Sequence, residues 1–169
     1  MKKALIVVDM QKDFIDGSLG SKEAVAIVPN VIKKIEEYRK NGDRIIFTMD
    51  THGENYPETN EGKHLPVVHC IKGTDGWKIP DDILISEGTV IEKSSFGYTK
   101  WNEQGLEDVD EIELIGLCTD ICVVSNALII KALFPEKKIT VDQNCCAGVT
   151  VESHKAALET MKMCQIEIL

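Results

Sequence analysis

Three reactive side chains follow apolar runs of the sequence. Asp9 ends the run ALIVVD, Lys93 ends TVIEK, and Cys122 lies a few residues beyond IELIGL. Taken singly, each has an ordinary structural explanation: a turn or cap carboxylate, a solvated charge and a core thiol. In open α/β sheets, however, ligands bind beyond the carboxyl ends of the strands. Finding all three side chains at such ends favours a shared chemical role.

A carboxylate, an ammonium and a thiol together can form an activated nucleophile. A helix N-terminus and a nearby ammonium both favour the thiolate over the thiol. A carboxylate within reach can accept the thiol proton and return it to a leaving group. Backbone N–H groups in the turn before Cys122 could hold an oxyanion. No histidine lies near these strand ends, so a papain-like Cys–His pair is not expected.

The elements that must position these residues alternate along the chain. Near-continuous Val, Ile and Leu runs suit strands of a sheet that is covered on both faces. The predicted strands are 4–9, 44–50, 89–93, 112–117, 138–143 and 165–169, and the predicted helices are 29–41, 120–134 and 150–163. Pro29 is expected to begin the first helix, with Thr119 and Thr150 as N-caps of the others.

This alternation predicts an α/β fold. We expect a single domain, residues 1–169, built as a three-layer Rossmann-like sandwich. Its six-stranded sheet would be mostly parallel, with helices on both faces.

Composition excludes several classes of function. The chain has 169 residues, 43% hydrophobic content and a net charge of -9, so a nucleic-acid partner, which needs a clustered basic surface, is not expected. No apolar run reaches the roughly 18 residues of a membrane span, and the N-terminus does not resemble a signal peptide. The six cysteines show no CxxC spacing, which favours free thiols and a cytoplasmic location.

The segment 51–88 is unusually long for a connection between two strands. Loops of this length in a compact domain are usually functional. The segment contains His52, His64 and His69, which are three of the four histidines, and it follows Asp50 directly. An Asp-x-His pair at a strand end, completed by a later histidine, can bind one metal ion. The alternative is a polar surface loop with scattered histidines.

The stretches LIVVDMQKDF, VIEKSSF and ELIGLCTDICV resemble the isochorismatase-like cysteine hydrolases, the superfamily of nicotinamidases and related amidohydrolases. The resemblance implies that Asp9 is the general base, Lys93 its electrostatic partner and Cys122 the nucleophile. It further implies a cis peptide bond between Leu117 and Cys118. The backbone N–H groups of Cys118 and Cys122 would then form the oxyanion hole.

The same resemblance implies a metal site. The DTH stretch and the LPVVHC stretch are similar to nicotinamidase motifs, although LPVVHC has one extra residue between proline and histidine. Asp50, His52 and His69 are the ligands that this similarity implies. Glu61 in NEGK is the expected fourth ligand, and His64 is a less favoured substitute. These ligands suit a divalent metal, in the first place zinc, with iron or manganese as alternatives.

A substrate pocket is expected beside these groups. Phe14, in QKDF, matches a ring-packing position of the family, and Trp77, Phe96 and Tyr98 are further candidates for the pocket wall. Ordinary packing is the alternative for these aromatic residues. The stretch KSSFGYT departs from the commoner K-x-x-Y-S-A-F pattern of the family, so the shape of the pocket is expected to differ.

The favoured function is a cysteine amidohydrolase, a nicotinamidase that converts nicotinamide and water to nicotinate and ammonia through a thioester. Isochorismatases of the superfamily lack the cysteine, so Cys122 points to amide hydrolysis. One alternative is a metal-free amidohydrolase that acts on a ureido, carbamoyl or other small amide. A remote one is a non-catalytic redox-sensing or binding domain. The expected partner is a small amide substrate, without nucleic acid or membrane, and the resemblance implies a homo-oligomer.

Overall fold

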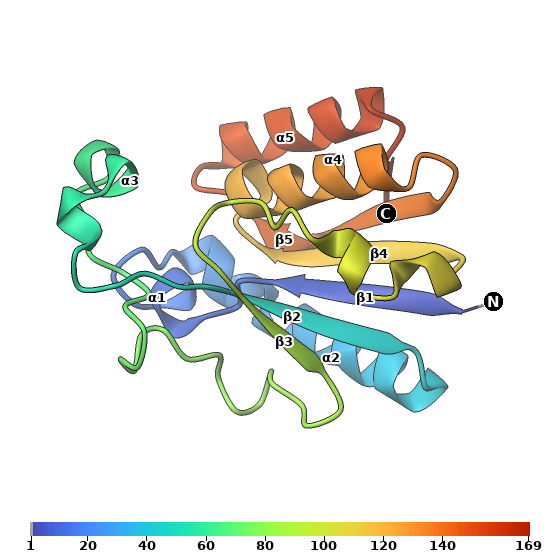
Figure 1. The fold of residues 1–169 in the computed structure, drawn as a ribbon, viewed down its shortest axis with the longest axis horizontal. Coiled ribbons are helices and arrows are strands. Elements are labelled where there is room, and N and C mark those ends of the chain that lie inside the picture. Colours follow the sequence, from blue (N-terminus) through green and yellow to red (C-terminus); the bar gives the residue numbers. More distant parts are fainter. Residues whose placement is uncertain (1) are drawn as a thin grey trace.

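The computed structural model describes residues 2–169, and these residues form one six-stranded parallel sheet with helices on both faces (Figure 1). The order across the sheet is β3-β2-β1-β4-β5-β6. The strands are β1 Lys3–Val8, β2 Arg44–Asp50, β3 Thr89–Lys93, β4 Glu111–Leu117, β5 Lys138–Ala147 and β6 Glu167–Ile168. The order in which strands are added reverses between β1 and β4: β2 and β3 lie on one side of β1, and β4, β5 and β6 lie on the other. Sheets of this type open a crevice for ligands at that point. The predicted fold class is confirmed.

The central strand β1 is apolar from Ala4 to Val8 because both faces of the sheet are covered there. Side chains of β1 alternate between two cores: Leu5 and Val7 face one, whereas Ala4, Ile6 and Val8 face the other. All five side chains are fully buried. This double coverage explains why the sequence shows continuous apolar runs rather than alternation.

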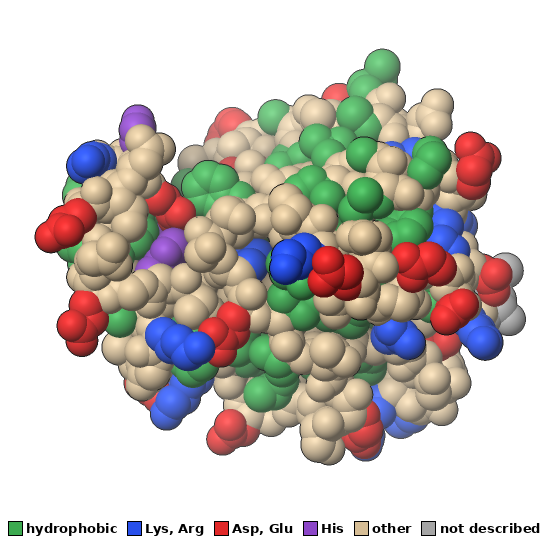
Figure 2. All heavy atoms as spheres, in the orientation of Figure 1, with side chains coloured by type: hydrophobic (Ala, Val, Ile, Leu, Met, Phe, Trp, Pro, Cys, Tyr) green, Lys and Arg blue, Asp and Glu red, His purple; other side chains and the backbone are tan. Residues whose placement is uncertain are grey.

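Five α-helices accompany the sheet: α1 Lys12–Ile15, α2 Lys22–Asn41, α3 Asn60–His64, α4 Val124–Leu133 and α5 Val151–Met163. Helix α2 covers one face, α4 and α5 cover the other, and α3 projects away from the sheet in the segment 51–88 (Figure 1). Short 3-10 turns cover Tyr56–Glu58, Trp101–Glu103 and Leu106–Asp108. Figure 2 shows hydrophobic side chains gathered over the region of α4. No helix in residues 2–169 is both long and apolar enough to span a bilayer.

The first long helix begins earlier than the sequence indicated. We predicted its start at Pro29, but α2 begins at Lys22 and Pro29 lies inside it. The Ser21 side chain caps the helix by accepting a hydrogen bond from the Ala24 backbone N–H at 3.0 Å. Ala24 and Ile27 continue the buried stripe of the helix upstream of the proline. Burial of that apolar stripe therefore outweighs the single backbone hydrogen bond that proline cannot make.

Thr119 was also assigned wrongly, as an N-cap. The segment Thr119–Val123 forms a π-helical turn that leads into α4, and its cap position is Cys118, without a side-chain cap bond. The Thr119 hydroxyl instead lies 2.8 Å from Nδ1 of His154 on α5. Thr150, by contrast, does cap α5, since its hydroxyl accepts from the Ser153 backbone N–H at 3.0 Å. Single-turn π segments are frequent at functional sites.

Candidate active site

Asp9 follows β1 directly and is fully buried. Its backbone has a φ of 46°, which turns the chain sharply at the end of the strand. The Thr48 hydroxyl, on neighbouring β2, donates to Oδ1 of Asp9 at 2.6 Å. Oδ2 lies 2.6 Å from Nζ of Lys93. Both carboxylate oxygens are thus fixed by residues that two other strands supply.

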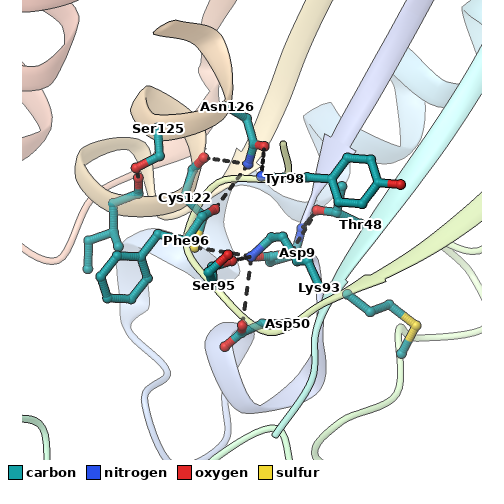
Figure 3. A network of polar contacts seen from close by, with 12 residues as sticks. Asp9, Thr48, Asp50, Lys93, Ser95, Phe96, Tyr98, Cys122, Ser125 and Asn126 are labelled. Atoms are coloured by element: carbon teal, nitrogen blue, oxygen red, sulfur yellow. Dashed lines mark hydrogen bonds and ion pairs between the residues drawn. The ribbon is translucent and has the colours of Figure 1, made fainter. Parts of the chain in front are cut away.

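Lys93 ends β3 and connects the other groups of the site (Figure 3). Besides Asp9, its Nζ atom lies 3.6 Å from Sγ of Cys122 and 3.7 Å from Oδ1 of Asp50. It also donates to the Ser95 carbonyl at 3.0 Å. A single buried ammonium therefore faces two carboxylates and the thiol.

Cys122 lies in the π-helical turn between β4 and α4. The peptide bond between Leu117 and Cys118 is cis, as the resemblance implied. Just before it, Gly116 has a φ of +116°, and a Cβ atom there would lie 2.1 Å from the Val8 carbonyl oxygen. Only glycine lets the ends of β1 and β4 approach this closely. The approach brings the turn that carries Cys122 beside the residue that follows Val8, which is Asp9.

Burial dominates the electrostatics of the trio. It raises the pKa of the Asp9 carboxyl, against the opposing charge of Lys93. Burial also raises the pKa of the Cys122 thiol well above its ordinary range, and the charge of Asp9 adds to this rise. Although burial alone would lower the pKa of the Lys93 ammonium, the charges of Asp9, Cys122 and Asp50 raise it. Burial of Cys122 therefore favours the thiol form, against the effects of the helix N-terminus and of the Lys93 ammonium that favour the thiolate.

Four further groups converge beside the trio: Asp50, His52, Glu61 and His69. Their ligand atoms all lie within 4.8 Å of one another. Nε2 of His52 is 2.9 Å from Oδ2 of Asp50 and 3.6 Å from Oε1 of Glu61. Nε2 of His69 is 3.5 Å and 3.7 Å from the same two oxygens. His64 lies apart from this group, exposed, with Nδ1 at 2.8 Å from the Asn60 carbonyl.

The donor set fits a divalent metal. Nδ1 of His69 lies 2.8 Å from the Val67 carbonyl, which orients the ring with Nε2 toward the other three groups. Metal-binding histidines are commonly oriented in this way. Oδ1 of Asp50 is buried without a hydrogen-bond partner among the described residues. Two imidazoles and two carboxylates suit zinc, iron or manganese.

The predicted pocket residues differ in their surroundings. Phe14 is buried with its ring centroid 5.5 Å from that of His69, and the half-buried Trp77 donates from Nε1 to the Thr51 hydroxyl at 2.9 Å. Both lie beside the four-group cluster. Phe96 is 44% exposed. Tyr98 packs edge-on against Trp101, and its hydroxyl accepts a hydrogen bond from the Gln104 side chain at 3.3 Å.

Access to the thiol is narrow. Cys122 is only 4% exposed. Two surface hollows, of about 590 and 250 Å³, are lined by other residues and by none of the catalytic trio.

Three buried residues that we did not select from the sequence hold the site together: Thr48, Gln11 and Asn126. The Gln11 side chain accepts from the Asp50 backbone N–H at 2.7 Å and donates to the Asp50 carbonyl at 2.8 Å. Asn126 donates to the Cys122 carbonyl at 2.8 Å. The available signal was weak: Gln11 falls inside the motif that follows Asp9, whereas nothing in the spacing marks Thr48 or Asn126.

The chain is similar to several known proteins over almost its whole length. A nicotinamidase/pyrazinamidase of Mycobacterium tuberculosis is 26% identical, over 99% of this chain and 98% of its own. The structure of a pyrazinamidase of Pyrococcus horikoshii in complex with zinc is similar over 100% of this chain and 99% of its own, with a TM-score of 0.86 and 28% identity. An N-carbamoylsarcosine amidase of Thermoplasma acidophilum has a TM-score of 0.82 and 29% identity, over 99% and 95% of the two chains. The sequence model of the Isochorismatase domain matches residues 3–169, and the chain therefore belongs to the isochorismatase family.

Proposed function

We propose that this protein is a metal-containing cysteine amidohydrolase, a nicotinamidase that converts nicotinamide to nicotinate and ammonia. The observation that carries the proposal is the position of Lys93 Nζ. It lies 2.6 Å from Asp9, 3.6 Å from Cys122 and 3.7 Å from Asp50. A nucleophile, its base and a metal-binding group thus adjoin one another around a single ammonium. Similarity to a nicotinamidase/pyrazinamidase and to a zinc-containing pyrazinamidase supports this substrate class.

In the first step, the Asp9 carboxylate accepts the proton of the Cys122 thiol as Sγ attacks the carboxamide carbon. Because the pKa of the thiol is raised, transfer of the proton and attack by sulfur are expected together rather than from a standing thiolate. The backbone N–H groups of Cys118 and Cys122 would donate to the resulting oxyanion. Lys93 keeps its proton and stabilises the negative charge that moves from Asp9 toward the substrate.

In the second step, the tetrahedral intermediate collapses and the carbon–nitrogen bond breaks. Asp9 gives its proton to the departing nitrogen, which leaves as ammonia, and an acyl thioester remains on Cys122. Asp9 then accepts a proton from a water molecule that attacks the thioester carbon. Collapse of the second intermediate breaks the carbon–sulfur bond and releases the carboxylic acid, and Asp9 returns its proton to Sγ, which restores the thiol and the carboxylate.

We further propose that Asp50, His52, His69 and Glu61 hold a divalent metal, most simply zinc. When bound, the metal supplies a Lewis-acidic position for a ring nitrogen of the substrate. Phe14 and Trp77 lie beside this group and would form the wall against which an aromatic ring packs. Phe96 would border the pocket from the opposite, exposed side. Tyr98 fits ordinary packing better, since its contacts lead to Trp101 and Gln104.

The second candidate is a metal-free amidase that acts on a carbamoyl or ureido compound. Similarity to an N-carbamoylsarcosine amidase favours it, because that protein has nearly the same fold similarity to this chain. The convergence of two histidines and two carboxylates beside Lys93 weighs against it. A non-catalytic redox domain has less support, because Asp9 and Lys93 are buried beside Cys122 in the arrangement of a base and a cation around a nucleophile.

The test is ammonia release from nicotinamide by the zinc-loaded protein, beside a Cys122→Ala variant. We expect turnover by the parent and its loss in the variant, because the trio acts as a unit. A panel of carbamoyl amino acids serves as the comparison. A parent that binds zinc and hydrolyses only the carbamoyl compounds would contradict the nicotinamide assignment while leaving the hydrolase assignment standing.

The remaining expectations stay predictions. We expect the enzyme to act in the cytoplasm as a homo-oligomer, which localisation of the tagged protein and light scattering of the purified protein would check.

A further inference from the structure

Asn126 lies on α4, one turn after the nucleophile, and is completely buried. Its side chain makes four hydrogen bonds, and Figure 3 draws those to Cys122, Phe96 and Tyr98. Nδ2 donates to the carbonyls of Cys122 at 2.8 Å and Phe96 at 3.2 Å. Oδ1 accepts from the Tyr98 backbone N–H at 2.8 Å and from Nε1 of Trp101 at 3.1 Å. A buried amide that satisfies four partners is a strong local constraint.

The orientation of this amide is unambiguous. The two partners of Nδ2 are carbonyls, which only accept, and the two partners of Oδ1 are N–H groups, which only donate. A flipped amide would face four mismatched partners. The side chain of Asn126 can therefore make these four hydrogen bonds in one orientation only.

The hydrogen bonds of the Asn126 side chain join the two segments that carry the nucleophile and the ammonium. One of these bonds goes to the carbonyl of Cys122 itself. Two others go to Phe96 and Tyr98, in the segment that begins directly after β3. In that same segment the Ser95 carbonyl accepts from Nζ of Lys93. One side chain thus links the turn of Cys122 to the chain that anchors Lys93.

We propose that Asn126 is a positioning residue that sets the separation between Lys93 Nζ and Cys122 Sγ, 3.6 Å in this structure. The proposal rests on the hydrolase function proposed above. Asn126 lies on the side of the trio away from the four-group cluster, to which none of its four hydrogen bonds leads. Its loss should therefore impair the chemical step more than substrate binding and leave metal binding intact.

The test variant is Asn126→Ser. A serine on a helix can donate to the carbonyl four residues earlier, as Ser125 does to Ile121 at 2.6 Å. The variant thus keeps a bond to Cys122 and loses those to Phe96, Tyr98 and Trp101. We expect kcat to fall about 10- to 100-fold, the range that a misplaced catalytic group can cause, with a smaller change of KM and a zinc content close to the parent value.

A second variant removes one of the partners of the Asn126 side chain instead of Asn126 itself. Trp101→Phe removes the N–H that Asn126 accepts from Trp101, and we expect a smaller fall of kcat in the same direction. It serves in place of Asn126→Ser if that variant fails to fold. The matched control is Ser125→Ala, at the neighbouring residue. This variant loses a hydrogen bond within the helical segment but no hydrogen bond to the segment after β3, so its kcat should equal the parent value.

The crystal structure of Asn126→Ser adds a readout that needs no substrate. We expect the distance from Lys93 Nζ to Cys122 Sγ to exceed that in the parent. An unchanged distance between Lys93 Nζ and Cys122 Sγ would overturn the proposal. So would an unchanged kcat in both Asn126→Ser and Trp101→Phe when the parent is active. A parent that hydrolyses no amide would instead overturn the proposed function, and the crystallographic distance would still decide the role of Asn126.

Discussion

Asp9 and Lys93 form an ion pair that is almost completely removed from water, with side chains that are 0% and 1% exposed. Burying charges is costly unless each finds a partner. Here Lys93 is shared between Asp9, Asp50 and the thiol, and removing it would leave the buried carboxylate of Asp9 without a counter-charge. Such a site is built for reactivity rather than for stability.

The acidic limb of the pH profile should report Asp9. Its carboxyl must be ionised to accept the thiol proton, and burial raises its pKa. As the pH falls through that raised pKa, the ionised fraction and kcat/KM should fall together. We therefore expect the limb above the ordinary aspartate value of about 3.9. A plot of kcat/KM against pH, with zinc content measured at each pH, checks this; a limb at or below the ordinary value, at constant zinc content, would contradict it.

Replacement of Lys93 should destabilise the protein as well as inactivate it. We expect Lys93→Met to lower the free energy of unfolding by about 3–5 kcal/mol, because Asp9 and Asp50 lose their shared cation. The double variant Asp9→Asn/Lys93→Met should recover much of this loss, since one buried charge is then absent. Urea denaturation of the three proteins at neutral pH measures the effect, and equal losses in the single and double variants would speak against it.

At the scale of the elements, the site depends on how closely the ends of β1 and β4 approach. Both strands run parallel in register, with Val8 opposite Gly116. The residue after Val8 is the proposed base, Asp9, and the segment after β4 carries the cis peptide bond and the proposed nucleophile, Cys122. Strand pairing at this position therefore brings the two side chains of the proposed mechanism together.

Gly116→Ala should disrupt that approach. Its new Cβ atom would meet the Val8 carbonyl at 2.1 Å, in a backbone conformation that side chains rarely adopt. We expect the free energy of unfolding to fall by about 2–3 kcal/mol, with a loss of amidase activity. The matched control is Gly42→Ala, at a φ of +70° with nothing within 4 Å of the new Cβ. That variant should lose about 1 kcal/mol and keep its activity; equal effects on activity would refute the argument.

For the whole molecule, the metal is expected to act as a stabilising ligand. Its four expected ligands come from the end of β2 and from the long segment 51–88, so binding would fix that segment against the sheet. A ligand at 100 times its Kd stabilises the folded state by about 2.7 kcal/mol. For a chain of this size that corresponds to a rise in Tm of about 5–10 °C.

Thermal unfolding of the metal-depleted protein with and without added zinc tests this linkage. The control is the double variant Asp50→Asn/His69→Ala, whose Tm should not respond to zinc. An equal rise of Tm in parent and control would show that zinc binds elsewhere, for example to one of the free thiols.

The sequence by itself determined the class of the fold and the residues to consider. Continuous apolar runs such as ALIVVD predict strands that are buried on both faces, and their order predicts a parallel sheet. Parallel strands end at the same edge, so Asp9, Lys93 and Cys122 could be expected to meet there. These inferences succeed because periodicity and strand polarity are local properties that survive folding unchanged.

The tertiary structure alone decided how these residues are held. Side-chain hydrogen bonds join residues that lie from 4 to 39 positions apart in the sequence. They link Thr48 to Asp9, Gln11 to Asp50 and Asn126 to Cys122. Likewise, the start of α2 at Lys22, upstream of Pro29, follows from packing against the sheet rather than from local propensity. Side-chain hydrogen bonds and burial depend on which segments pack together, and one-dimensional spacing does not contain that information.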